Sequence, residues 1–317
     1  MSVAPPQTRR VAFLGPRGTF TEAALLSQPD LANAELVECP TMPDILDAVA
    51  NGVVDAGFLA LENALEGSVT STLDGLIFDH DLLIQREVVS AIHHALLVRP
   101  GVTLETVTAV LSIREALAQC RVYHREHLGG TEEILTTSTA AAAAQVSENL
   151  DSHWAAIAPA RAGAVYGLTA LAEEIEDHPD NTTRFVLVTR DGLPAPTGHD
   201  KTTIVCFQHF NQPGSLLAIL QEFAARSINL TRLESRPTKA SLGSYCFVID
   251  LEGHVADEVV GDALVHVRQR LHGLKFLGSY PAAGADDSRR RRRVEANTAA
   301  VEWLTATRAK PASSWAS

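Results

Sequence analysis

Short apolar runs alternate with amphipathic stretches in the N-terminal part of the chain. Residues 11–14, 36–38 and 56–61 have the length and composition of buried strands. Residues 23–26 and 42–51, which separate them, have the pattern of helices. This β-α-β-α-β order predicts a mostly parallel sheet with helices on both faces. In such sheets, ligands bind beyond the carboxyl ends of the strands.

A second series of the same kind follows an extended stretch at residues 82–98, which we interpret as a crossing between two lobes. Its expected strands are residues 107–111, 133–135, 154–157 and 181–189, with helices at 115–126, at 140–144 and from Pro159. Two lobes joined by crossing strands, with a cleft between them, form a two-lobed α/β architecture of the periplasmic-binding-protein-like (type II) class. The expected lobes are residues 10–85 with 174–190, and residues 86–173.

Residues 191–200 are rich in Gly and Pro and predict a linker before a further domain at 201–281. We expect strands at 202–207, 228–234, 244–251 and 274–280, and helices at 216–226 and 257–271. That order is the βαββαβ of ferredoxin-like domains. If its first two strands are neighbours, the Pro213-Gly214-Ser215 turn meets Glu234-Ser235-Arg236-Pro237. The turn, with apolar side chains beside it, would suit an amino-acid ligand.

The two ends of the chain differ from these domains. We expect residues 1–9 to be disordered and residues 282–317 to form a basic tail with a short helix at 294–308. The tail contains five consecutive arginines, Arg289–Arg293. A basic run can bind nucleic acid, but here it stands outside both domains of an acidic chain. A solvated or intersubunit patch is therefore the preferred interpretation.

Composition narrows the choice of partners. The 317 residues carry a net charge of −12, which argues against nucleic acid or an anionic membrane as the main partner. No apolar run approaches the length of a membrane span. Cys39, Cys120, Cys206 and Cys246 are scattered, so we expect free thiols in the cytoplasm. The histidines, including the adjacent His93 and His94, form no metal-binding motif, and no metal or cofactor is predicted.

Polar residues gather where the predicted strands of the first lobe end. A glycine turn leads into the possible capping box Thr19-Phe20-Thr21-Glu22, and Ser71–Asp74 resembles another. Helix N-termini offer backbone N–H groups that suit a carboxylate, although each cap alone is an ordinary helix start. The turn is neither a dinucleotide fingerprint nor a P-loop, so it does not indicate a nucleotide. An anionic, oxygen-rich ligand is the better match.

The strand at 181–189 opens with the side-chain amide, two hydroxyls and guanidinium of Asn181-Thr182-Thr183-Arg184. Arginine binds carboxylates in a fork, and hydroxyls adapt as donor or acceptor. In a regular strand Thr183 and Phe185 point to one face and Arg184 to the other, so Arg184 either precedes the strand or supports the site from behind. In the second lobe Ser112, Ser138 and Thr139 stand at strand ends, where N-capping is the more common role for the last two.

These stretches resemble prephenate dehydratase from about residue 10 to 281. The motifs that carry the resemblance are Gly15-Pro16-Arg17-Gly18-Thr19-Phe20-Thr21, Glu62-Asn63, Gly67-Ser68-Val69, Thr72-Leu73-Asp74 and Thr183-Arg184-Phe185. The C-terminal part resembles an ACT domain of the phenylalanine-binding type, through Gly214-Ser215-Leu216-Leu217 and Glu234-Ser235-Arg236-Pro237. The chain departs from the family at Ser112-Ile113-Arg114-Glu115, at Thr137 and at Pro159-Ala160.

The resemblance implies a lyase that converts prephenate to phenylpyruvate in phenylalanine biosynthesis, with phenylalanine as feedback ligand. Thr183 corresponds to the catalytic hydroxyl of the family, and Asn63, Gln119 and Ser112 to residues that contact substrate or affect turnover. The remaining catalytic candidates are Arg184 and Glu62. The substrate-binding candidates are Gly18, Thr19, Phe20, Thr21, Gly67, Ser68, Val69, Ser112, Ser138, Thr139 and Phe185. The effector-binding candidates are Asn211, Pro213, Gly214, Ser215, Leu216, Leu217, Glu234, Ser235, Arg236 and Pro237.

The residues leave alternatives open at this point. Arogenate dehydratase would use the same chemistry on the amino analogue of prephenate. A non-catalytic amino-acid sensor would keep the lobes and the ACT domain without turnover. The effector could be tyrosine, or phenylalanine could activate. A homodimer or homotetramer that associates through its ACT domains is the expected assembly.

Overall fold

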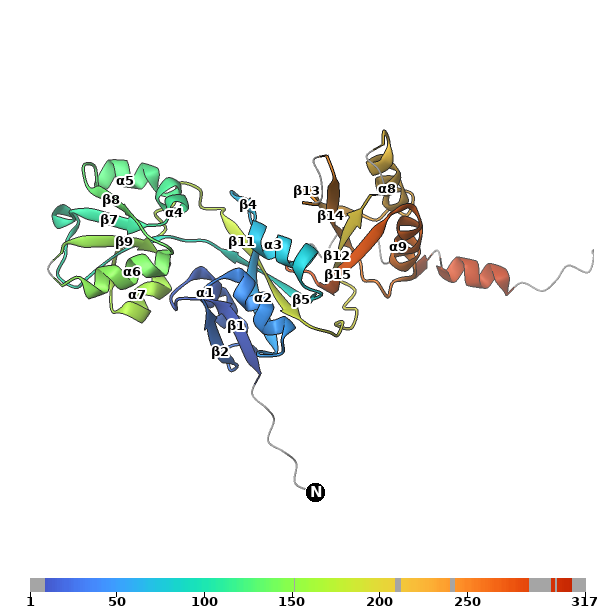
Figure 1. The fold of residues 1–317 in the computed structure, drawn as a ribbon, viewed down its shortest axis with the longest axis horizontal. Helices are drawn as coiled ribbons and strands as arrows, with labels where there is room; N and C mark the ends of the chain where they lie inside the picture. The colour runs from blue at the N-terminus through green and yellow to red at the C-terminus, as the bar shows by residue number, and fades with distance from the viewer. Residues whose placement is uncertain are drawn as a thin grey trace, which may run out of the picture. The chain divides into compact units, whose positions relative to one another are not determined.

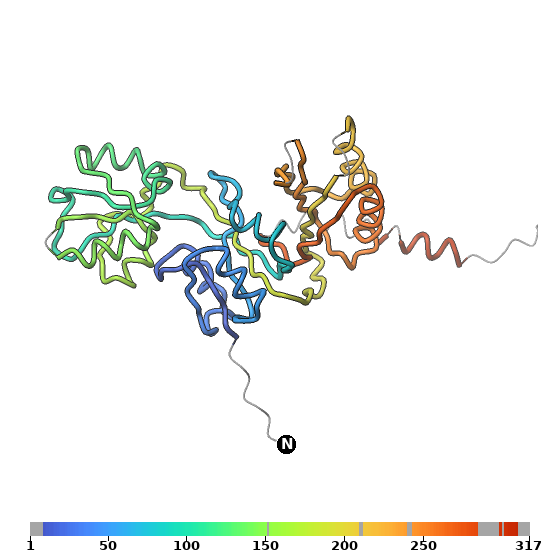
Figure 2. The backbone as a smooth tube through the Cα atoms, viewed as in Figure 1, coloured from blue at the N-terminus to red at the C-terminus, as the bar shows by residue number. Residues whose placement is uncertain are grey.

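The computed structural model describes residues 9–150, 152–208, 212–239, 243–284, 298–299 and 301–309 (Figures 1 and 2). The chain forms two compact units, Met1–Ala282 and Ala283–Ser317. In the second unit, residues 301–308 are helical, with exposed Val301, Trp303 and Leu304. The predicted Arg289–Arg293 run and residues 1–8 lie outside the described residues.

The first lobe is built on a sheet of strand order β2-β1-β3-β11-β5. β1 pairs in parallel with β2 and β3, as predicted, whereas β11 returns antiparallel between β3 and β5. The apolar residues of α1 cover one face of this sheet, and those of α2 and α3 cover the other. The elements are β1 (Arg10–Leu14), α1 (Phe20–Leu26), β2 (Glu35–Cys39), α2 (Met42–Ala50), β3 (Ala56–Asn63), β4 (Gly67–Ser68), α3 (Thr70–Asp74), the π-helix Gly75–Asp79, β5 (Leu83–Ala91) and β11 (Thr182–Thr189).

The second lobe is built on a sheet of order β10-β6-β9-β7-β8. Figure 1 shows α4 and α5 on one face of this sheet and α6 and α7 on the other. Alanines of α6 and α7 pack closely against the strands, which explains why a helix of weak amphipathicity is stable there. The elements are β6 (Ala95–Val98), the 3₁₀ turn Leu104–Thr106, β7 (Ala109–Ser112), α4 (Arg114–Gln119), α5 (Arg121–His127), β8 (Glu132–Leu135), α6 (Thr139–Glu148), β9 (Trp154–Ala158), α7 (Ala160–Tyr166) and β10 (Thr169–Ala172).

Two extended crossings join the lobes, as the sequence predicted. One runs from β5 of the first sheet to β6 of the second, and the other returns from β10 to β11. The crossings are bonded to each other, because Ile175 N–H donates to His94 O at 3.0 Å and Ile92 N–H donates to Asn181 O at 2.9 Å. Paired crossings of this kind act as a hinge region between two lobes.

Several local predictions were wrong. The helix expected at 115–126 is two helices that meet at Cys120, whose φ of −113° and ψ of 22° interrupt the helical backbone. α3 begins after Val69 without a side-chain cap, so Ser71–Asp74 is not a capping box. The edge strand β10 was missed, because its four residues, Thr-Ala-Leu-Ala, are too few to show a strand period and none of them is buried.

The C-terminal domain has a sheet of order β13-β14-β12-β15 with α8 and α9 packed on one face. This is the predicted ferredoxin-like βαββαβ arrangement. However, β14 lies between β12 and β13, so the condition under which the Pro213-Gly214-Ser215 turn would meet Glu234–Pro237 of the same chain is not met. The elements are β12 (Asp200–Phe207), α8 (Ser215–Ala224), β13 (Leu230–Pro237), β14 (Tyr245–Glu252), α9 (Glu258–Arg270) and β15 (Gly273–Pro281).

The other face of this sheet packs on the first lobe. Val205, Val248 and Leu277 belong to the same buried apolar cluster as Ile84 and Val186 of the first sheet. β15 lies against β5, and a Cβ atom at Gly278 would stand only 2.4 Å from Ile84 O. A glycine at position 278 therefore lets two backbones approach where no side chain fits.

Candidate active site between two lobes

A threonine hydroxyl and a carboxamide meet where β11 begins beside the end of β3. Thr183 pairs with Asn63 in the strand register, and Asn63 Nδ2 donates a hydrogen bond to Thr183 Oγ1 at 2.9 Å. Both residues were predicted as site residues, and they come from opposite ends of the first lobe's sequence. Thr183 is 8% exposed, so most of its side chain is buried.

The orientation of the Asn63 amide follows from its backbone partners. Asn63 Oδ1 accepts hydrogen bonds from Leu65 N–H at 2.9 Å and Glu66 N–H at 3.0 Å. Because backbone N–H groups only donate, this oxygen must face them, and Nδ2 must face Thr183. Thr183 Oγ1 is consequently the acceptor. Its own proton has no acceptor among the described side chains and remains available to a ligand.

From Asn63, further side-chain hydrogen bonds of fixed direction lead into the second lobe. Asn63 Nδ2 also donates to Asn181 Oδ1 at 2.9 Å, and Asn181 Nδ2 donates to Gln119 Oε1 at 3.0 Å. Gln119, on α4, is another predicted site residue. Its Oε1 lies 3.2 Å from His94 Nε2, and its Nε2 donates to Glu66 Oε1 at 3.4 Å. The first lobe, the hinge and the second lobe thus share one hydrogen-bonded network.

His94 is the member of this network that the sequence did not reveal. Since Gln119 Oε1 already accepts, His94 Nε2 carries the proton and Nδ1 is the bare nitrogen. The side chain is buried against the Phe20 ring, with ring centroids 5.2 Å apart. Burial lowers the pKa of His94 and outweighs its bond to Gln119, so the imidazole is neutral at pH 7. An isolated histidine without a motif gives no signal in a sequence.

The glycine turn of the first lobe contacts the second lobe. Thr19 caps α1 by accepting from Glu22 N–H at 3.2 Å, as predicted, and Glu22 Oε2 accepts from Gly18 N–H at 2.7 Å. Arg161 of α7 donates through Nε to the same Glu22 oxygen at 2.7 Å. Burial would raise the pKa of Glu22, but these bonds outweigh it and lower the pKa. The turn and the first residues of α1, Gly18 to Thr21, therefore lie at the boundary between the lobes.

Four other predicted site residues make contacts within their own lobes. Ser112 Oγ donates to Ile157 O at 2.7 Å inside the second sheet and is fully buried. Ser138 Oγ accepts from Ala141 N–H as the cap of α6, and Thr139, the first residue of that helix, is buried. Phe185 stacks on Phe58 in the core, with ring centroids 5.5 Å apart. These four side chains support the lobes and do not extend the Thr183 network.

Gly67, Ser68 and Val69 form a short hairpin on β3 that faces the C-terminal domain. Ser68 Oγ donates to Glu234 Oε2 at 2.5 Å and accepts from Arg232 Nη2 at 2.5 Å. Gly67 is exposed, and its φ of +77° turns the hairpin. The expected substrate role of Ser68 therefore conflicts with where its hydroxyl points.

Arg184 also points away from Thr183. It lies within β11, and its guanidinium contacts Asp250 and Tyr280 of the C-terminal domain and Glu87 of β5. Glu62 is 3.5 Å from Arg184 Nη1 on the same side. Of the two options that the sequence left for Arg184, the structure shows the one behind the site.

Two of the effector candidates bind the first lobe in this structure. Glu234 bonds to Ser68, and Arg236 Nη2 bonds to Asp74 Oδ1 at 2.7 Å. Ser215 Oγ accepts from Gln208 Nε2 at 2.8 Å, and Leu217 is 57% exposed. Gly214, with φ +83°, precedes α8. Leu216 is half-buried on α8, Ser235 is exposed, Pro213 precedes Gly214 and Pro237 ends β13, whereas Asn211 lies outside the described residues.

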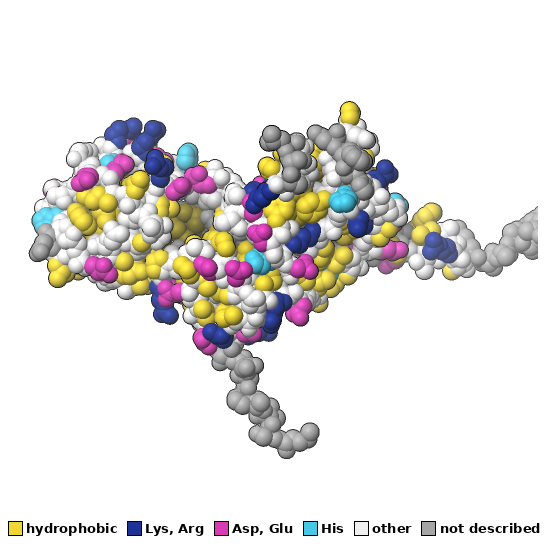
Figure 3. All heavy atoms as spheres, viewed as in Figure 1, with side chains coloured by type: hydrophobic (Ala, Val, Ile, Leu, Met, Phe, Trp, Pro, Cys, Tyr) yellow, Lys and Arg dark blue, Asp and Glu magenta, His cyan; other side chains and the backbone are white. Residues whose placement is uncertain are grey.

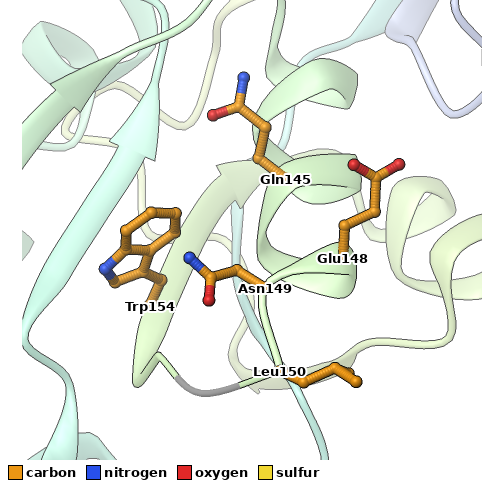
Figure 4. Close-up of a pocket in the computed structure, with 5 residues that line it drawn as sticks. All are labelled: Gln145, Glu148, Asn149, Leu150 and Trp154. Atoms are coloured by element: carbon orange, nitrogen blue, oxygen red, sulfur yellow. The ribbon is translucent and has the colours of Figure 1, made fainter.

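Two hollows show where small molecules have room. One, of about 410 Å³, is lined by residues of both lobes, among them Gly15, Pro16, Glu38 and Ser138. A larger one, of about 560 Å³, lies at the end of α6 and the start of β9 (Figure 4). Figure 4 shows Gln145, Glu148 and Asn149 there, with Leu150 and Trp154. The larger hollow offers neither a hydroxyl nor a cation, so it does not share the chemistry of the Thr183 network.

Charge on the surface is mixed. Figure 3 shows lysine and arginine side chains gathered over α5, and elsewhere interspersed with acidic ones. Within the described ranges, no group of three His, Cys, Asp or Glu side chains is arranged to hold a metal ion. Across the same residues, no helix has the length and apolar character needed to cross a membrane.

Comparison with known proteins gives a consistent result. The family model for prephenate dehydratase matches residues 11–192, and that for the ACT domain matches residues 202–265. A prephenate dehydratase from Mycobacterium leprae is 41% identical over 291 residues, covering 89% of this chain and 88% of the relative.

Solved structures of similar fold include a relative with a bound amino acid. Prephenate dehydratase from Arthrobacter aurescens, in complex with L-Phe, is 41% identical with a TM-score of 0.80, covering 93% of this chain and 99% of that one. GqqA, described as a quorum-quenching acylase, is 31% identical with a TM-score of 0.77, covering 87% and 98%.

Proposed function

This chain belongs to the prephenate dehydratase family, and we propose that it converts prephenate to phenylpyruvate, CO₂ and water. The reaction expels the ring hydroxyl and the ring carboxylate together and leaves an aromatic ring, so the driving force lies in the substrate. The enzyme must orient the hydroxyl and stabilise it as it departs with negative charge.

The observation that carries this proposal is the hydrogen bond that Thr183 Oγ1 accepts from Asn63. Asn63 donates to Thr183 Oγ1, which leaves the threonine proton free to bond to the departing oxygen of the substrate. A threonine hydroxyl is a weak acid at pH 7, so it acts as a hydrogen-bond donor more than as a proton source. Water or the medium supplies the proton that turns the departing hydroxide into water.

Prephenate also carries two carboxylates, which need cationic or N–H partners. Arg161 is fixed through Nε by Glu22, while no described group bonds to its two terminal nitrogens. Arg17 contributes Nε to Glu38 at 3.1 Å on the exposed side of the same turn. We assign carboxylate binding to Arg161 first, and to Arg17 second. Arg184 does not serve this purpose, because its guanidinium is occupied by carboxylates of the protein.

L-Phenylalanine is the proposed effector, bound by the ACT domain. The Arthrobacter relative is in complex with L-Phe, and the effector motifs of this chain are placed at Gly214–Leu217 and Glu234–Pro237. Within one chain β14 separates β12, which leads to the first motif, from β13, which contains the second. We therefore propose that two copies of the chain complete the effector site, as a homodimer or homotetramer.

The proposed catalytic and regulatory domains have the boundaries that the sequence pattern predicts. Residues 10–190 would form the catalytic domain, 191–200 the linker and 201–281 the regulatory domain. The family models, which match 11–192 and 202–265, support this division.

Incubation of the purified protein with prephenate, followed by detection of phenylpyruvate, tests the function. We expect turnover of prephenate in preference to arogenate, and lower turnover when phenylalanine is added. Conversion of arogenate alone would replace the substrate assignment. Absence of turnover, together with binding of phenylalanine, would favour the amino-acid sensor.

The fold of GqqA raises acyl transfer as a second activity. A nucleophilic threonine needs a base within hydrogen-bond distance to accept its proton. Thr183 Oγ1 instead accepts a hydrogen bond from the Asn63 amide, which cannot act as such a base. The site therefore favours hydrogen-bond donation over nucleophilic attack.

A further inference from the structure

The residue next to the Thr183 hydroxyl is an arginine buried between two domains. Arg184 is 9% exposed and follows Thr183 directly in β11. Its side chain leaves the strand on the face opposite Thr183, towards the sheet of the ACT domain. Arg184 Nη1 donates to Asp250 Oδ2 at 2.5 Å, and Nη2 donates to Tyr280 Oη at 2.6 Å. Asp250 lies on β14 and Tyr280 on β15.

The donors and acceptors around this arginine form a closed ring. A guanidinium only donates and a carboxylate only accepts, so the roles of Arg184 and Asp250 in the ring are fixed. Thr203 of β12 must donate to Asp250 Oδ1, at 2.6 Å. Tyr280 must then donate to Thr203 Oγ1, also at 2.6 Å, while it accepts from Arg184. Each of the four side chains thus holds its neighbours in one arrangement.

Charge ties this ring to the first lobe as well. Glu87 of β5 is ion-paired with Arg184 Nε at 2.6 Å and with Lys201 Nζ at 2.8 Å. Asp250 is fully buried, which raises its pKa, but Arg184 and Arg232 outweigh burial and lower it, so the carboxylate is ionised. A buried charge that loses its partner is strongly destabilised. Arg184 therefore has to follow any shift of β14 or β15.

The backbone around Arg184 carries such a shift to the site. Arg184 pairs with Glu62 and Thr183 pairs with Asn63, so the ring and the catalytic pair occupy adjacent rungs of the same ladder. The register of this ladder shifts between Arg184 and Phe185. Such an irregularity interrupts the ladder to β3 at this point, while the pairing of β11 with β5 stays in register there.

We infer that Arg184 is a positioning residue: Asp250 and Tyr280 of the ACT domain hold its guanidinium, and this contact places the Thr183 hydroxyl for catalysis. The inference rests on the proposed function, because it gives Thr183 its catalytic part. It also provides a route by which a change in the ACT domain reaches the site, since three of the four ring members, Thr203, Asp250 and Tyr280, belong to strands of that domain.

The test uses three full-length variants. Tyr280→Phe removes one oxygen from the ring, and Asp250→Asn keeps the shape of the side chain but removes its charge. Lys275→Ala is the matched control, because Lys275 Nζ bonds to Ile77 O at 3.2 Å and His80 O at 2.6 Å across the same pair of domains without touching Arg184. Far-ultraviolet circular dichroism and the melting temperature establish which variants are folded.

We expect kcat for prephenate to fall about tenfold or more in Tyr280→Phe and Asp250→Asn, because small misplacements of a catalytic group are costly. KM should stay within about twofold, since the contact does not reach the substrate. Lys275→Ala should keep both constants within about twofold of the parent. Folded Tyr280→Phe with the kcat of the parent protein would overturn the inference.

Hydrogen exchange of the peptide covering 182–189 provides a readout that does not need turnover. Loss of the ring should speed exchange in Tyr280→Phe and Asp250→Asn but not in Lys275→Ala. If the parent protein does not act on prephenate, the proposed function fails, and the exchange data alone decide whether the ring positions β11. Unchanged exchange in a folded Tyr280→Phe would then reject the positioning role. If Asp250→Asn does not fold, Tyr280→Phe decides by itself.

Discussion

At the scale of single residues, one amide orientation decides what the Thr183 hydroxyl can do. Two backbone N–H groups hold Asn63 Oδ1, so the other half of the amide must donate to Thr183 Oγ1. A hydroxyl that accepts in this way keeps its own proton free to rotate towards another acceptor. The catalytic role proposed for Thr183 thus depends on the hydrogen bonds that Leu65 and Glu66 N–H donate to Asn63.

Thr183→Ala removes the donor and should lower kcat by about 10²–10³. The fold and KM should be retained, because the side chain makes a single side-chain hydrogen bond in the structure. Steady-state kinetics with prephenate measure the effect, and Thr183→Ser, which keeps the hydroxyl, is the control. Unchanged kcat in Thr183→Ala would remove this residue from the mechanism.

Asn63→Asp separates the two jobs of the amide. A carboxylate can still accept from Leu65 and Glu66 N–H, but it can no longer donate to Thr183 Oγ1. The threonine proton would turn towards the new carboxylate, so kcat should fall by about 10², while the lost bond to Asn181 Oδ1 should cost some thermal stability. Asn63→Ala should lower both kcat and thermal stability, since the N–H groups of Leu65 and Glu66 also lose their acceptor. Equal kcat in Asn63→Asp and the parent protein would contradict the assigned orientation.

At the scale of elements, the first turn of α1 joins the two lobes. Glu22 receives hydrogen bonds from Gly18 N–H of its own lobe and from Arg161 of α7. Its side chain is 2% exposed, so this ion pair is shielded from solvent on the carboxylate side. The boundary between the lobes therefore carries a charge that depends on pH.

Glu22→Gln should lower the free energy of unfolding by about 1–3 kcal/mol at pH 7, through loss of charge-assisted hydrogen bonds. The pKa of Glu22 is lowered in the folded protein, so its contribution is present in full above the usual pKa of 4.5 and is lost as the pH falls further. Urea denaturation at pH 7 and at pH 3.5 measures this. The gap between the parent protein and Glu22→Gln should narrow at the lower pH, and a constant gap would count against the ion pair.

The sequence predicted most elements because their apolar runs are long and regular. β1, β2, α2 and β3 lie within two residues of the expected ranges. β10 was missed because it is only four residues long and has no buried position, and the break at Cys120 is not marked by a Gly or Pro. Local patterns also could not show which domain covers which face. The partners of Arg184 and Ser68 lie far away in the sequence. His94 likewise meets Gln119 only after the chain has folded.

At the scale of the whole folded unit Met1–Ala282, the ACT domain and the first lobe share one apolar core. Gly278→Ala tests how tightly they are joined, because the new Cβ would stand 2.4 Å from Ile84 O and φ is +140°. We expect a loss of about 3 kcal/mol or more in the free energy of unfolding. Gly101→Ala is the control, since φ is +94° there but no atom lies within 4 Å, and it should cost about 1–2 kcal/mol. Equal losses would mean that the two sheets can shift enough to accommodate the added methyl group.

The glycine- and proline-rich linker suggests that the chain could be cut there into two independent pieces, but the shared core does not permit this. A fragment ending near Asp191 would uncover part of the apolar cluster that contains Ile84 and Val186, since Val205, Val248 and Leu277 of the ACT domain belong to it. Such a face promotes self-association. Chimeras that exchange the ACT domain with a relative would therefore have to carry the matching surface of β5 and β11, and a fusion designed from the linker alone would aggregate.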